Sequence, residues 1–249
     1  AELVPAGVQV PVDRLLEAAG GNPLFLEETV RMISEAGESS EGEELPVPSN
    51  LNALITSRLD QLGPTEKALA QNASVIGTTF WPDAVAAMNG LAGDLEAGLA
   101  ELQQRDLVRP GGSSRITGER EFAFKHVLIR DVAYGQLPKG RRAVLHRKFA
   151  DWVAELPRDE DELSEIIAYH FEQACLTART VARPVESPPV VPAVEALMRA
   201  AGKAERREGF REAERFYTRA LELAEDTEVA LRSELRYRRA RMLVGRGDL

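Results

Sequence analysis

The chain has 249 residues, of which 40 are Asp or Glu and 31 are Lys or Arg, so its formal net charge at pH 7 is −9. This balance argues against a general affinity for nucleic acid or for an anionic membrane, because both need a surplus of basic side chains on the binding face. The length exceeds what one hydrophobic core usually occupies, so we expect two or three small domains.

The cysteine content and the hydropathy pattern restrict the protein further. Cys175 is the only cysteine, which excludes an intramolecular disulfide and any cysteine-based metal spacing. The sequence has no charged-then-apolar leader and no apolar run near the ~20 residues of a membrane helix, so we expect a cytoplasmic protein outside the membrane. Because the chain lacks an initial methionine and stops inside an expected repeat, we also expect a fragment of a larger protein.

The N-terminal segment is predicted to contain two helices and a linker. Helical spacing of apolar residues runs over 13–19 and 24–36, and a GGNP turn separates the two stretches. Asn22 is a favourable N-cap, and Pro23 takes the first helical position, where proline is preferred. Residues 37–48 are acidic and rich in Gly, Ser and Pro, so we expect a flexible linker there.

Residues 49–137 are predicted to form a winged-helix domain. Four short amphipathic helices are expected before the first strand, over residues 51–62, 64–77, 81–89 and 94–106. A two-stranded hairpin over 107–110 and 121–125 should follow, with a Gly-Gly turn and with Phe122 and Phe124 on one face. His126 ends this hairpin where the next helix begins.

The rest of the chain is predicted to be helical. Residues 138–179 read as a helical connector, and 180–192 as a Pro-rich linker, because proline cannot continue a helix. Residues 193–249 read as truncated tetratricopeptide-like repeats, with a second copy starting near Glu228. The small and aromatic residues that carry this spacing are Ala201, Phe210, Ala213, Tyr217 and Ala220. The predicted fold class is therefore mainly α: a winged-helix domain with a small β-hairpin, followed by an α-helical repeat region.

No residue pattern in the sequence predicts catalysis. The chain has no G-x-x-x-x-G-K-[ST] motif, no metal-ligand spacing and no nucleophile beside a base. His146 and His170 have apolar or aromatic neighbours, so we expect both to be core-edge histidines. Cys175 falls on a different helix face from His170. The fragment is thus not expected to be an enzyme or to bind a metal.

A winged helix raises the possibility of DNA binding, because the helix before the hairpin would enter the major groove. That helix carries Asp94, Glu96 and Glu101, whose carboxylates would repel phosphates. The wing carries arginines, with two glutamates beside the last of them: Arg109, Arg115, Glu119, Arg120 and Glu121. We therefore expect this domain to contact protein or nucleotide rather than DNA.

Two positions could contact an anion. The GGNP turn opens a helix, whose free N–H groups and positive end suit a phosphate. His126 could donate a hydrogen bond to such a group, or it could be a core histidine that hydrogen-bonds the backbone. Arg130, one turn later, could face the same pocket or pair with a carboxylate.

The order of these parts resembles the C-terminal half of the signal-transduction ATPases with numerous domains, the STAND class of P-loop ATPases. The resemblance is closest to bacterial multidomain regulators in which such an ATPase and tetratricopeptide repeats accompany a class III adenylate/guanylate cyclase domain or a transcriptional effector. The resemblance covers nearly the whole chain. Of the four segments that carry it, the one over residues 122–152 is the most specific to this class. The segments that carry it are GGNPLFLEE (20–28), VPSNLNALITSRLDQL (47–62), ASVIGTTFW (73–81) and FAFKHVLIRDVAYGQLPKGRRAVLHRKFADW (122–152).

The resemblance implies a nucleotide-sensing site. In this class a proline in a GxP turn lies against the nucleotide, and a histidine where the wing meets the next helix contacts the ADP phosphate in the resting state. Pro23 and His126 match these positions, with Asn22 and Arg130 beside them. Related plant and animal proteins have Met-His-Asp around the histidine, whereas this chain has Lys125-His126-Val127.

The resemblance also implies partners. Residues 1–36 would be the end of the helical lid of the ATPase module. ATP or ADP with Mg would be held by a P-loop domain upstream of this chain, so the fragment alone is expected to hold no cofactor. The repeats would bind a protein partner or associate with another copy.

The function implied by the resemblance is regulatory. The fragment would sense the nucleotide state and couple it to a cyclase or transcriptional effector outside this chain. The residues alone also allow a plain tetratricopeptide interaction module with a structural winged helix, and a DNA-binding winged-helix regulator. A shape of the intact protein that differs between ADP and ATP analogues would indicate the nucleotide-sensing function, and an unchanged shape would indicate the plain interaction module. Salt-sensitive binding to duplex DNA would indicate the DNA-binding regulator.

Overall fold

The structure is a computed structural model that describes Leu26 and residues 51–89, 94–112, 114, 116, 118–157, 160–183 and 186–245. The helices expected at 13–19 and 24–36, the linker at 37–48 and the site residues Asn22 and Pro23 lie outside the described residues, apart from Leu26, which is helical. The described part is mainly α-helical with one small sheet, which confirms the predicted class at that level.

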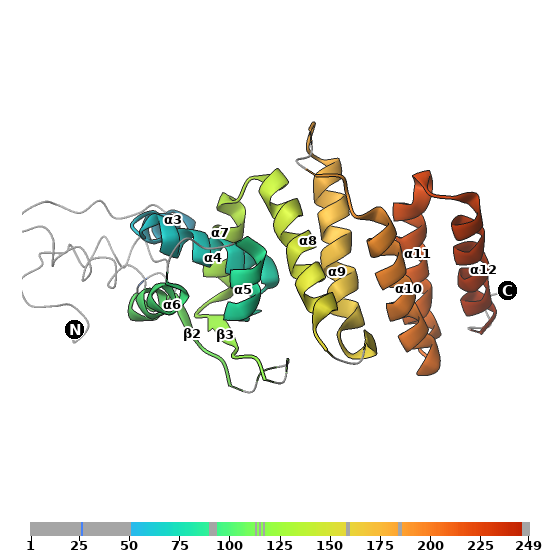
Figure 1. The fold of residues 1–249 in the computed structure, drawn as a ribbon, viewed down its shortest axis with the longest axis horizontal. Helices are drawn as coiled ribbons and strands as arrows, with labels where there is room; N and C mark the ends of the chain where they lie inside the picture. The colour runs from blue at the N-terminus through green and yellow to red at the C-terminus, as the bar shows by residue number, and fades with distance from the viewer. Residues whose placement is uncertain are drawn as a thin grey trace, which may run out of the picture.

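The sheet-bearing part holds the first helices and all described strands (Figure 1). Its elements are α3 (Leu51–Asp60), α4 (Pro64–Ile76), β1 (Thr79–Phe80), α5 (Pro82–Asn89), α6 (Leu95–Gln104), β2 (Val108–Pro110), β3 (Phe122–Phe124) and α7 (Val127–Gln136). Every helix predicted over 51–106 is present. The sheet is antiparallel with the strand order β1-β3-β2.

Strand β1 corrects the prediction that four helices precede the first strand and that the sheet has two strands. It lies between α4 and α5, and it pairs Thr79 with Ala123 and Phe80 with Phe122. A strand of two residues is too short to show the alternation of apolar and polar residues by which strands are predicted from sequence. The strand exists because the edge of β3 offers it backbone hydrogen-bonding groups, as shown by the Phe124 N–H, which donates to the Thr78 carbonyl at 2.9 Å.

The hairpin of β2 and β3 was predicted correctly. Phe122 and Phe124 are both buried, and their ring centroids lie 5.9 and 5.5 Å from that of Phe80. At the turn, the Gly111 N–H donates to the Glu121 carbonyl at 2.7 Å. A Cβ on Gly111 would lie only 2.9 Å from that carbonyl oxygen, so this close approach of the two strands requires glycine.

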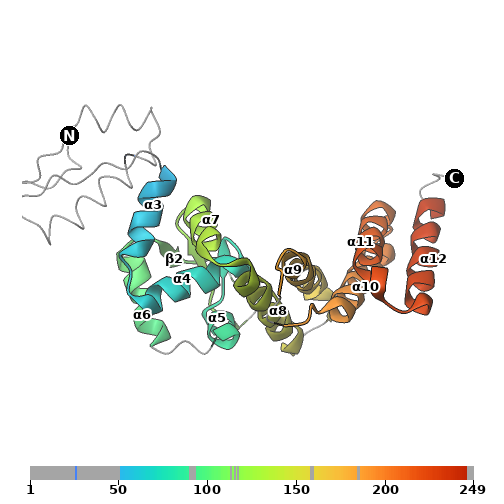
Figure 2. The same cartoon turned by 90° about the horizontal axis from the view of Figure 1, so that it is seen from above.

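The second part is a row of helices that extends away from the sheet (Figures 1 and 2). Its elements are α8 (Lys139–Glu155), α9 (Glu160–Arg179), α10 (Val190–Arg206), α11 (Phe210–Leu223), the short 3-10 helix η1 (Ala224–Asp226) and α12 (Val229–Gly245). Each helix packs on the next in chain order. Small residues make this close packing possible, because Ala201, Ala213 and Ala220 are fully buried.

The segment predicted as a linker over 180–192 is shorter in the structure. Helix α10 begins at Val190, so Pro192 lies in its first turn. Proline is tolerated there because the first N–H groups of a helix have no acceptor within the helix. Pro189 at the N-cap is buried, and Glu186 pairs with Arg147 of α8 at 3.3 Å. This connection is therefore held against α8.

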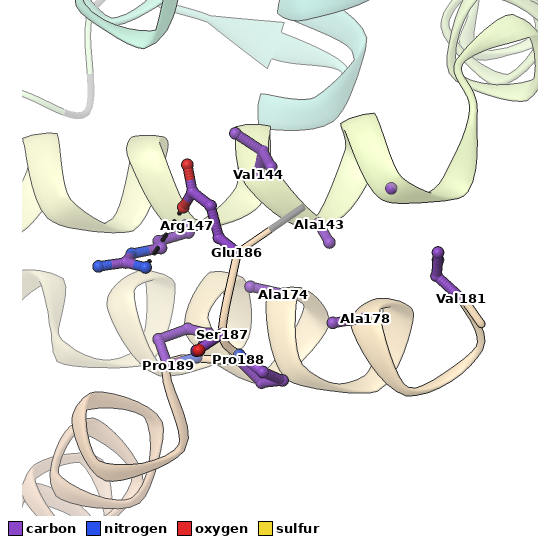
Figure 3. Close-up of a pocket in the computed structure, with 11 residues that line it drawn as sticks. Ala143, Val144, Arg147, Ala174, Ala178, Val181, Glu186, Ser187, Pro188 and Pro189 are labelled. Atoms are coloured by element: carbon purple, nitrogen blue, oxygen red, sulfur yellow. Dashed lines mark hydrogen bonds and ion pairs between the residues drawn. The ribbon is translucent and has the colours of Figure 1, made fainter. Parts of the chain in front are cut away.

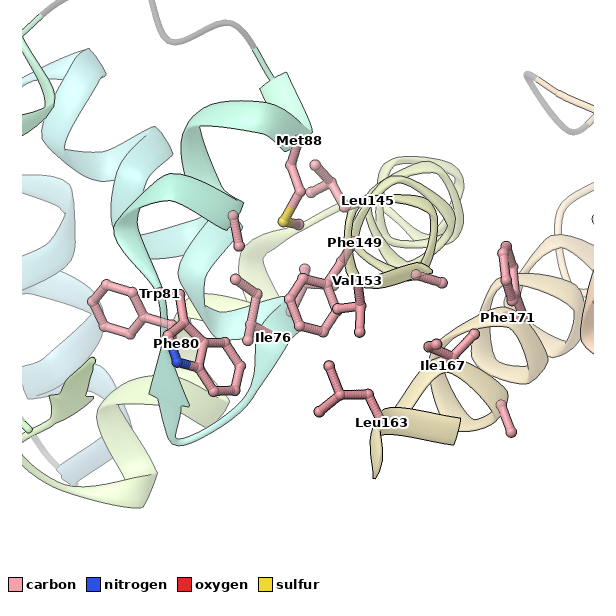
Figure 4. Packing of buried hydrophobic residues seen from close by; sticks show 14 of the residues in the cluster. Ile76, Phe80, Trp81, Met88, Leu145, Phe149, Val153, Leu163, Ile167 and Phe171 are labelled. Atoms are coloured by element: carbon pink, nitrogen blue, oxygen red, sulfur yellow. The ribbon is translucent and has the colours of Figure 1, made fainter. Parts of the chain in front are cut away.

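Helix α8 joins the two parts through one continuous core. Figure 4 shows Leu145, Phe149 and Val153 between α8 and the sheet-bearing part, while side chains of α9 approach from the other side. The rings of Trp81 and Phe149 are nearly parallel, with an interplanar angle of 8° and centroids 6.2 Å apart. Only Leu137 and Pro138 separate α7 from α8, so the two helices are also closely connected along the chain.

Candidate functional site

A polar stripe on α7 is the starting point of the candidate site. His126, Arg130 and Tyr134 are spaced four residues apart, so they lie on one face of this helix. Helix α7 packs against α3 and α4 and begins directly after β3, with His126 as its N-cap in an extended backbone conformation. The stripe therefore runs from the end of the sheet to the start of the helical row.

His126 is partly buried, and its side chain makes no capping hydrogen bond to α7. Its Nε2 atom is buried and has no hydrogen-bond partner among the residues that the structure describes. A core histidine that hydrogen-bonds the backbone, one of the two expected alternatives, does not account for this atom. A buried polar atom without a partner lowers the free energy of unfolding by about 1–3 kcal/mol, so the contacts in the described part of the chain leave this atom unfavourable.

Arg130 ties α7 to α4. Its Nε donates to the Ser74 carbonyl at 2.7 Å, and its Nη1 lies 3.0 Å from an Asp131 carboxylate oxygen. Its guanidinium also lies over the Tyr134 ring, 4.8 Å from the centroid. Of the two alternatives for Arg130, the structure shows the pairing with a carboxylate.

Tyr134 continues the stripe into the interior. Its hydroxyl lies 3.1 Å from Nε2 of His146 on α8, and Nδ1 of His146 lies 2.9 Å from Nδ1 of His170 on α9. His146 and His170 are 1% and 3% exposed, so they lie deeper in the core than the predicted core-edge positions. They are fully buried, and they form a pair. We call Tyr134, His146 and His170 the buried relay.

The two histidines are neutral at pH 7. Burial lowers the pKa of His146 to about 3, with a further contribution from the positive charges of Arg130 and Arg142. Burial also lowers the pKa of His170 well below its usual value, together with His146 and Arg130. A neutral imidazole carries one N–H, so one histidine donates to the other.

The direction of the relay follows from Tyr134. Burial raises the pKa of its hydroxyl, which therefore keeps its proton, and the guanidinium groups of Arg142 and Arg130 lie 4.5 and 4.8 Å from the centroid of its ring. A neutral hydroxyl can donate or accept. Because the positive charges of Arg142 and Arg130 favour lone pairs rather than a proton facing them, we assign Tyr134 as the donor to Nε2 of His146, whose remaining proton on Nδ1 is then donated to Nδ1 of His170. In this arrangement the proton of His170 is on Nε2.

His170 also borders a cavity of about 280 Å³ between the end of α4, the start of β1 and α9. The residues that line this cavity are Ile76, Gly77, Thr78, Thr79, Trp81, Phe149, Glu165, Ile166, Tyr169 and His170. A second cavity, between α8, α9 and residues 186–189, has a volume of only about 20 Å³ and is bordered by the pair of Arg147 and Glu186 (Figure 3). It has room for no more than a water molecule.

Helix α6 is the helix that would face DNA, and its carboxylates already have partners within the protein. Asp94 caps its N-terminus by accepting from the Glu96 and Ala97 N–H groups. Glu96 pairs with Arg120 of the wing, and Glu101 pairs with Arg105 at 2.6 Å. Glu96 thereby occupies one of the arginines that could have contacted a phosphate, which weakens the DNA-binding alternative further.

Cys175 offers no reactive thiol. It lies in the core at 0% exposure, and burial raises the pKa of its thiol to about 11. The thiolate, which is the reactive form, is therefore scarce at pH 7.

No protein-family model, curated protein or solved structure matches the chain. In the described ranges, no helix is both long and apolar enough to cross a membrane. The same ranges contain no group of three His, Cys, Asp or Glu side chains that could hold a metal ion. The polar stripe of α7, the buried relay and the larger cavity are thus the features with functional potential.

Proposed function

We propose that the chain is the regulatory part of a STAND-class signal-transduction ATPase. It senses whether ATP or ADP is bound to a P-loop domain upstream and passes this state to a cyclase or transcriptional effector outside the chain. In this proposal residues 49–137 are a winged-helix domain and α10 to α12 belong to tetratricopeptide-like repeats. The order of elements supports it: helices with a small antiparallel sheet, then a row of helices packed in sequence.

The observation that carries this proposal is the Nε2 atom of His126, which has no hydrogen-bond partner in the part of the chain that the structure describes. The side chain is only partly buried, so a rotation of the ring can bring Nε2 to the surface when the nucleotide domain docks. There it would donate to the ADP phosphate, with Asn22 and Pro23 on the turn that lies against the nucleotide. Arg130, already fixed by Ser74 and Asp131, would hold α7 in position rather than bind phosphate itself.

One hydrogen bond is enough for such a switch. A hydrogen bond to a charged group contributes about 1.5–3 kcal/mol. A resting equilibrium of 99 closed molecules to 1 open molecule corresponds to about 2.7 kcal/mol. Losing the contact of His126 would therefore bring the two states close to equal populations.

The same helix supplies the path to the repeats. A shift of α7 at His126 moves Tyr134, which is hydrogen-bonded to His146 of α8, and His146 is hydrogen-bonded to His170 of α9. Helices α9 to α12 then pack on one another in order. Packed rigid elements of this kind carry coupling between distant sites when they have two arrangements.

The test uses the full-length protein in solution scattering with ADP and with a non-hydrolysable ATP analogue. We expect a more compact particle with ADP, and we expect His126→Ala, measured at saturating ADP, to remove that difference and to raise basal output. The same particle dimensions with both nucleotides would contradict the proposal.

A second function is favoured by α12. Val229, Tyr237 and Val244 are 69%, 65% and 56% exposed and lie within one sector of this helix, away from Leu235 and Met242, which face the core. Such a surface suits a protein partner or a second copy of the chain. If the particle dimensions do not depend on the nucleotide but Tyr237→Arg abolishes partner binding, the chain is a plain interaction module.

A further inference from the structure

The larger cavity combines apolar walls with one buried polar group, and its surroundings define what it can hold. Trp81 and Phe149 form part of its wall and are 3% and 1% exposed, while Tyr169 stands at its edge with 44% exposure. Ile76 and Ile166 add aliphatic surface. Small-molecule sites usually have such walls with a few convergent polar groups.

The volume indicates the size of the occupant. A cavity of about 150 Å³ holds one benzene ring. The cavity beside His170 has about 280 Å³, nearly twice that volume. It therefore has room for two fused aromatic rings.

The charges around the cavity indicate a neutral occupant. Glu165 is the only carboxylate among the described residues of the cavity wall, and its Oε1 lies 2.7 Å from Nζ of Lys203, so its charge is compensated. His170 is neutral because of its burial. A charged molecule would lose its hydration without finding a free opposite charge among the described lining residues.

His170 supplies the directional contact. In the proton arrangement that we assigned to the buried relay, its Nδ1 accepts from the His146 N–H, so its own proton lies on Nε2. The polar group that the relay prepares at the cavity wall is thus a donor, and an occupant gains a hydrogen bond if it carries an acceptor.

We infer that this cavity is a binding site for a small, uncharged, two-ring aromatic molecule with a hydrogen-bond acceptor, which His170 recognises through its N–H. The inference rests on the cavity and the buried relay and does not depend on nucleotide sensing. Binding there would reach Tyr134 of α7 through His146, so an occupant would act on the helix that begins at His126.

The experiment uses two fused-ring probes of similar size on the 249-residue chain, quinoline with a ring acceptor and indole with a ring donor. Titrations followed by nuclear magnetic resonance give the two dissociation constants at pH 7.5. Quinoline should bind saturably and about fivefold to tenfold more tightly than indole, the ratio that one net hydrogen bond provides. The largest shifts should fall on the signals of His170, Tyr169 and Trp81.

Variants test the contributions of the cavity and of the buried relay individually. Ile166→Trp places a larger side chain in the cavity wall and should weaken quinoline at least tenfold, whereas Tyr237→Ala on α12 should leave it unchanged. His146→Leu removes the group that fixes the proton of His170 and should reduce the preference for quinoline to about onefold. If His146→Leu does not fold, the Ile166→Trp result still decides. No saturable binding of either probe, binding that survives Ile166→Trp, or a preference for indole would overturn the inference.

Discussion

His146 and His170 form a hydrogen-bonded pair in the interior, with their Nδ1 atoms 2.9 Å apart. The pair joins α8 to α9, and Tyr134 extends it to α7. Apolar side chains would have filled this space without the cost of burying three polar groups. A buried polar chain fixes one relative position of its helices, because any slip leaves its members unpaired.

Replacement of either histidine should destabilise the protein. His146→Phe removes both hydrogen bonds of the relay and leaves Tyr134 and His170 without this partner, so we expect the free energy of unfolding to fall by about 1–3 kcal/mol. Urea denaturation measures this change. The double variant with His170→Phe should be less destabilised than the sum of the single variants, because the second change removes a group already unpaired. Strictly additive losses would mean that the pair does not interact.

Stability should decrease in mild acid. Both histidines have a lower pKa in the folded chain than the usual value of 6.5, and that of His146 is about 3. Below pH 6.5 the unfolded chain therefore binds protons that the folded chain does not, so the stability present above pH 6.5 is lost as the pH falls. Each histidine contributes up to about 1.4 kcal/mol per pH unit.

The pH profile has an internal control. Between pH 6.5 and 5 the ordinary carboxylates stay ionised in both states, so the slope belongs mainly to the histidines. In the double variant His146→Phe/His170→Phe, the urea midpoint should change less with pH over this interval. An unchanged slope in the double variant would show that other groups cause it.

The ion pair of Glu172 and Arg219 should be the strongest charged contact in the helical row. It links α9 to α11 through two hydrogen bonds, one of them 2.8 Å from Nε to Oε1, and the side chain of Glu172 is only 9% exposed. We expect Glu172→Gln to cost about 1–2 kcal/mol in urea denaturation, since Arg219 is a third exposed and water screens part of the loss.

A matched control for Glu172 exists on α12. Glu234 pairs with Arg238 at 2.7 Å, but the two side chains are 47% and 40% exposed. Glu234→Gln should therefore cost less than about 0.5 kcal/mol. Equal losses at the two positions would refute the distinction between the buried and the exposed pair.

The elements that could be predicted from the sequence are those with local signals. The hairpin followed from the Gly-Gly turn and the alternating Phe122 and Phe124, and the helices over 51–106 from their amphipathic spacing. Strand β1 carried no such signal, since Thr79 and Phe80 form a strand only because β3 lies beside them. Pro192 misled the prediction of the linker because its place in the first helical turn removes the usual penalty.

The candidate site was only partly visible in the sequence. His126 stood out because a histidine follows a strand and starts a helix. The pairing of His146 with His170 was not predictable, because it depends on how α8 and α9 pack across residues 24 positions apart. Periodicity placed both near apolar neighbours but did not tell which faces of the two helices meet.

Replacement of His126 should not destabilise the protein, in contrast to replacement of His146. Because its buried Nε2 lacks a partner in the described part of the chain, His126→Leu removes an unfavourable polar atom at similar volume. We expect the 249-residue chain to become equally or more stable, by up to about 1 kcal/mol in urea denaturation. A loss greater than 1 kcal/mol would reveal a structural hydrogen bond and weaken the case for a sensor.

The central claim is that α7 reports the nucleotide state through His126, and amide hydrogen exchange of the full-length protein tests it most directly. With ADP, the amides of residues 127–136 should exchange at least several-fold more slowly than with a non-hydrolysable ATP analogue, and His126→Ala, measured at saturating ADP, should remove this difference. Identical exchange of α7 with both nucleotides would contradict the account.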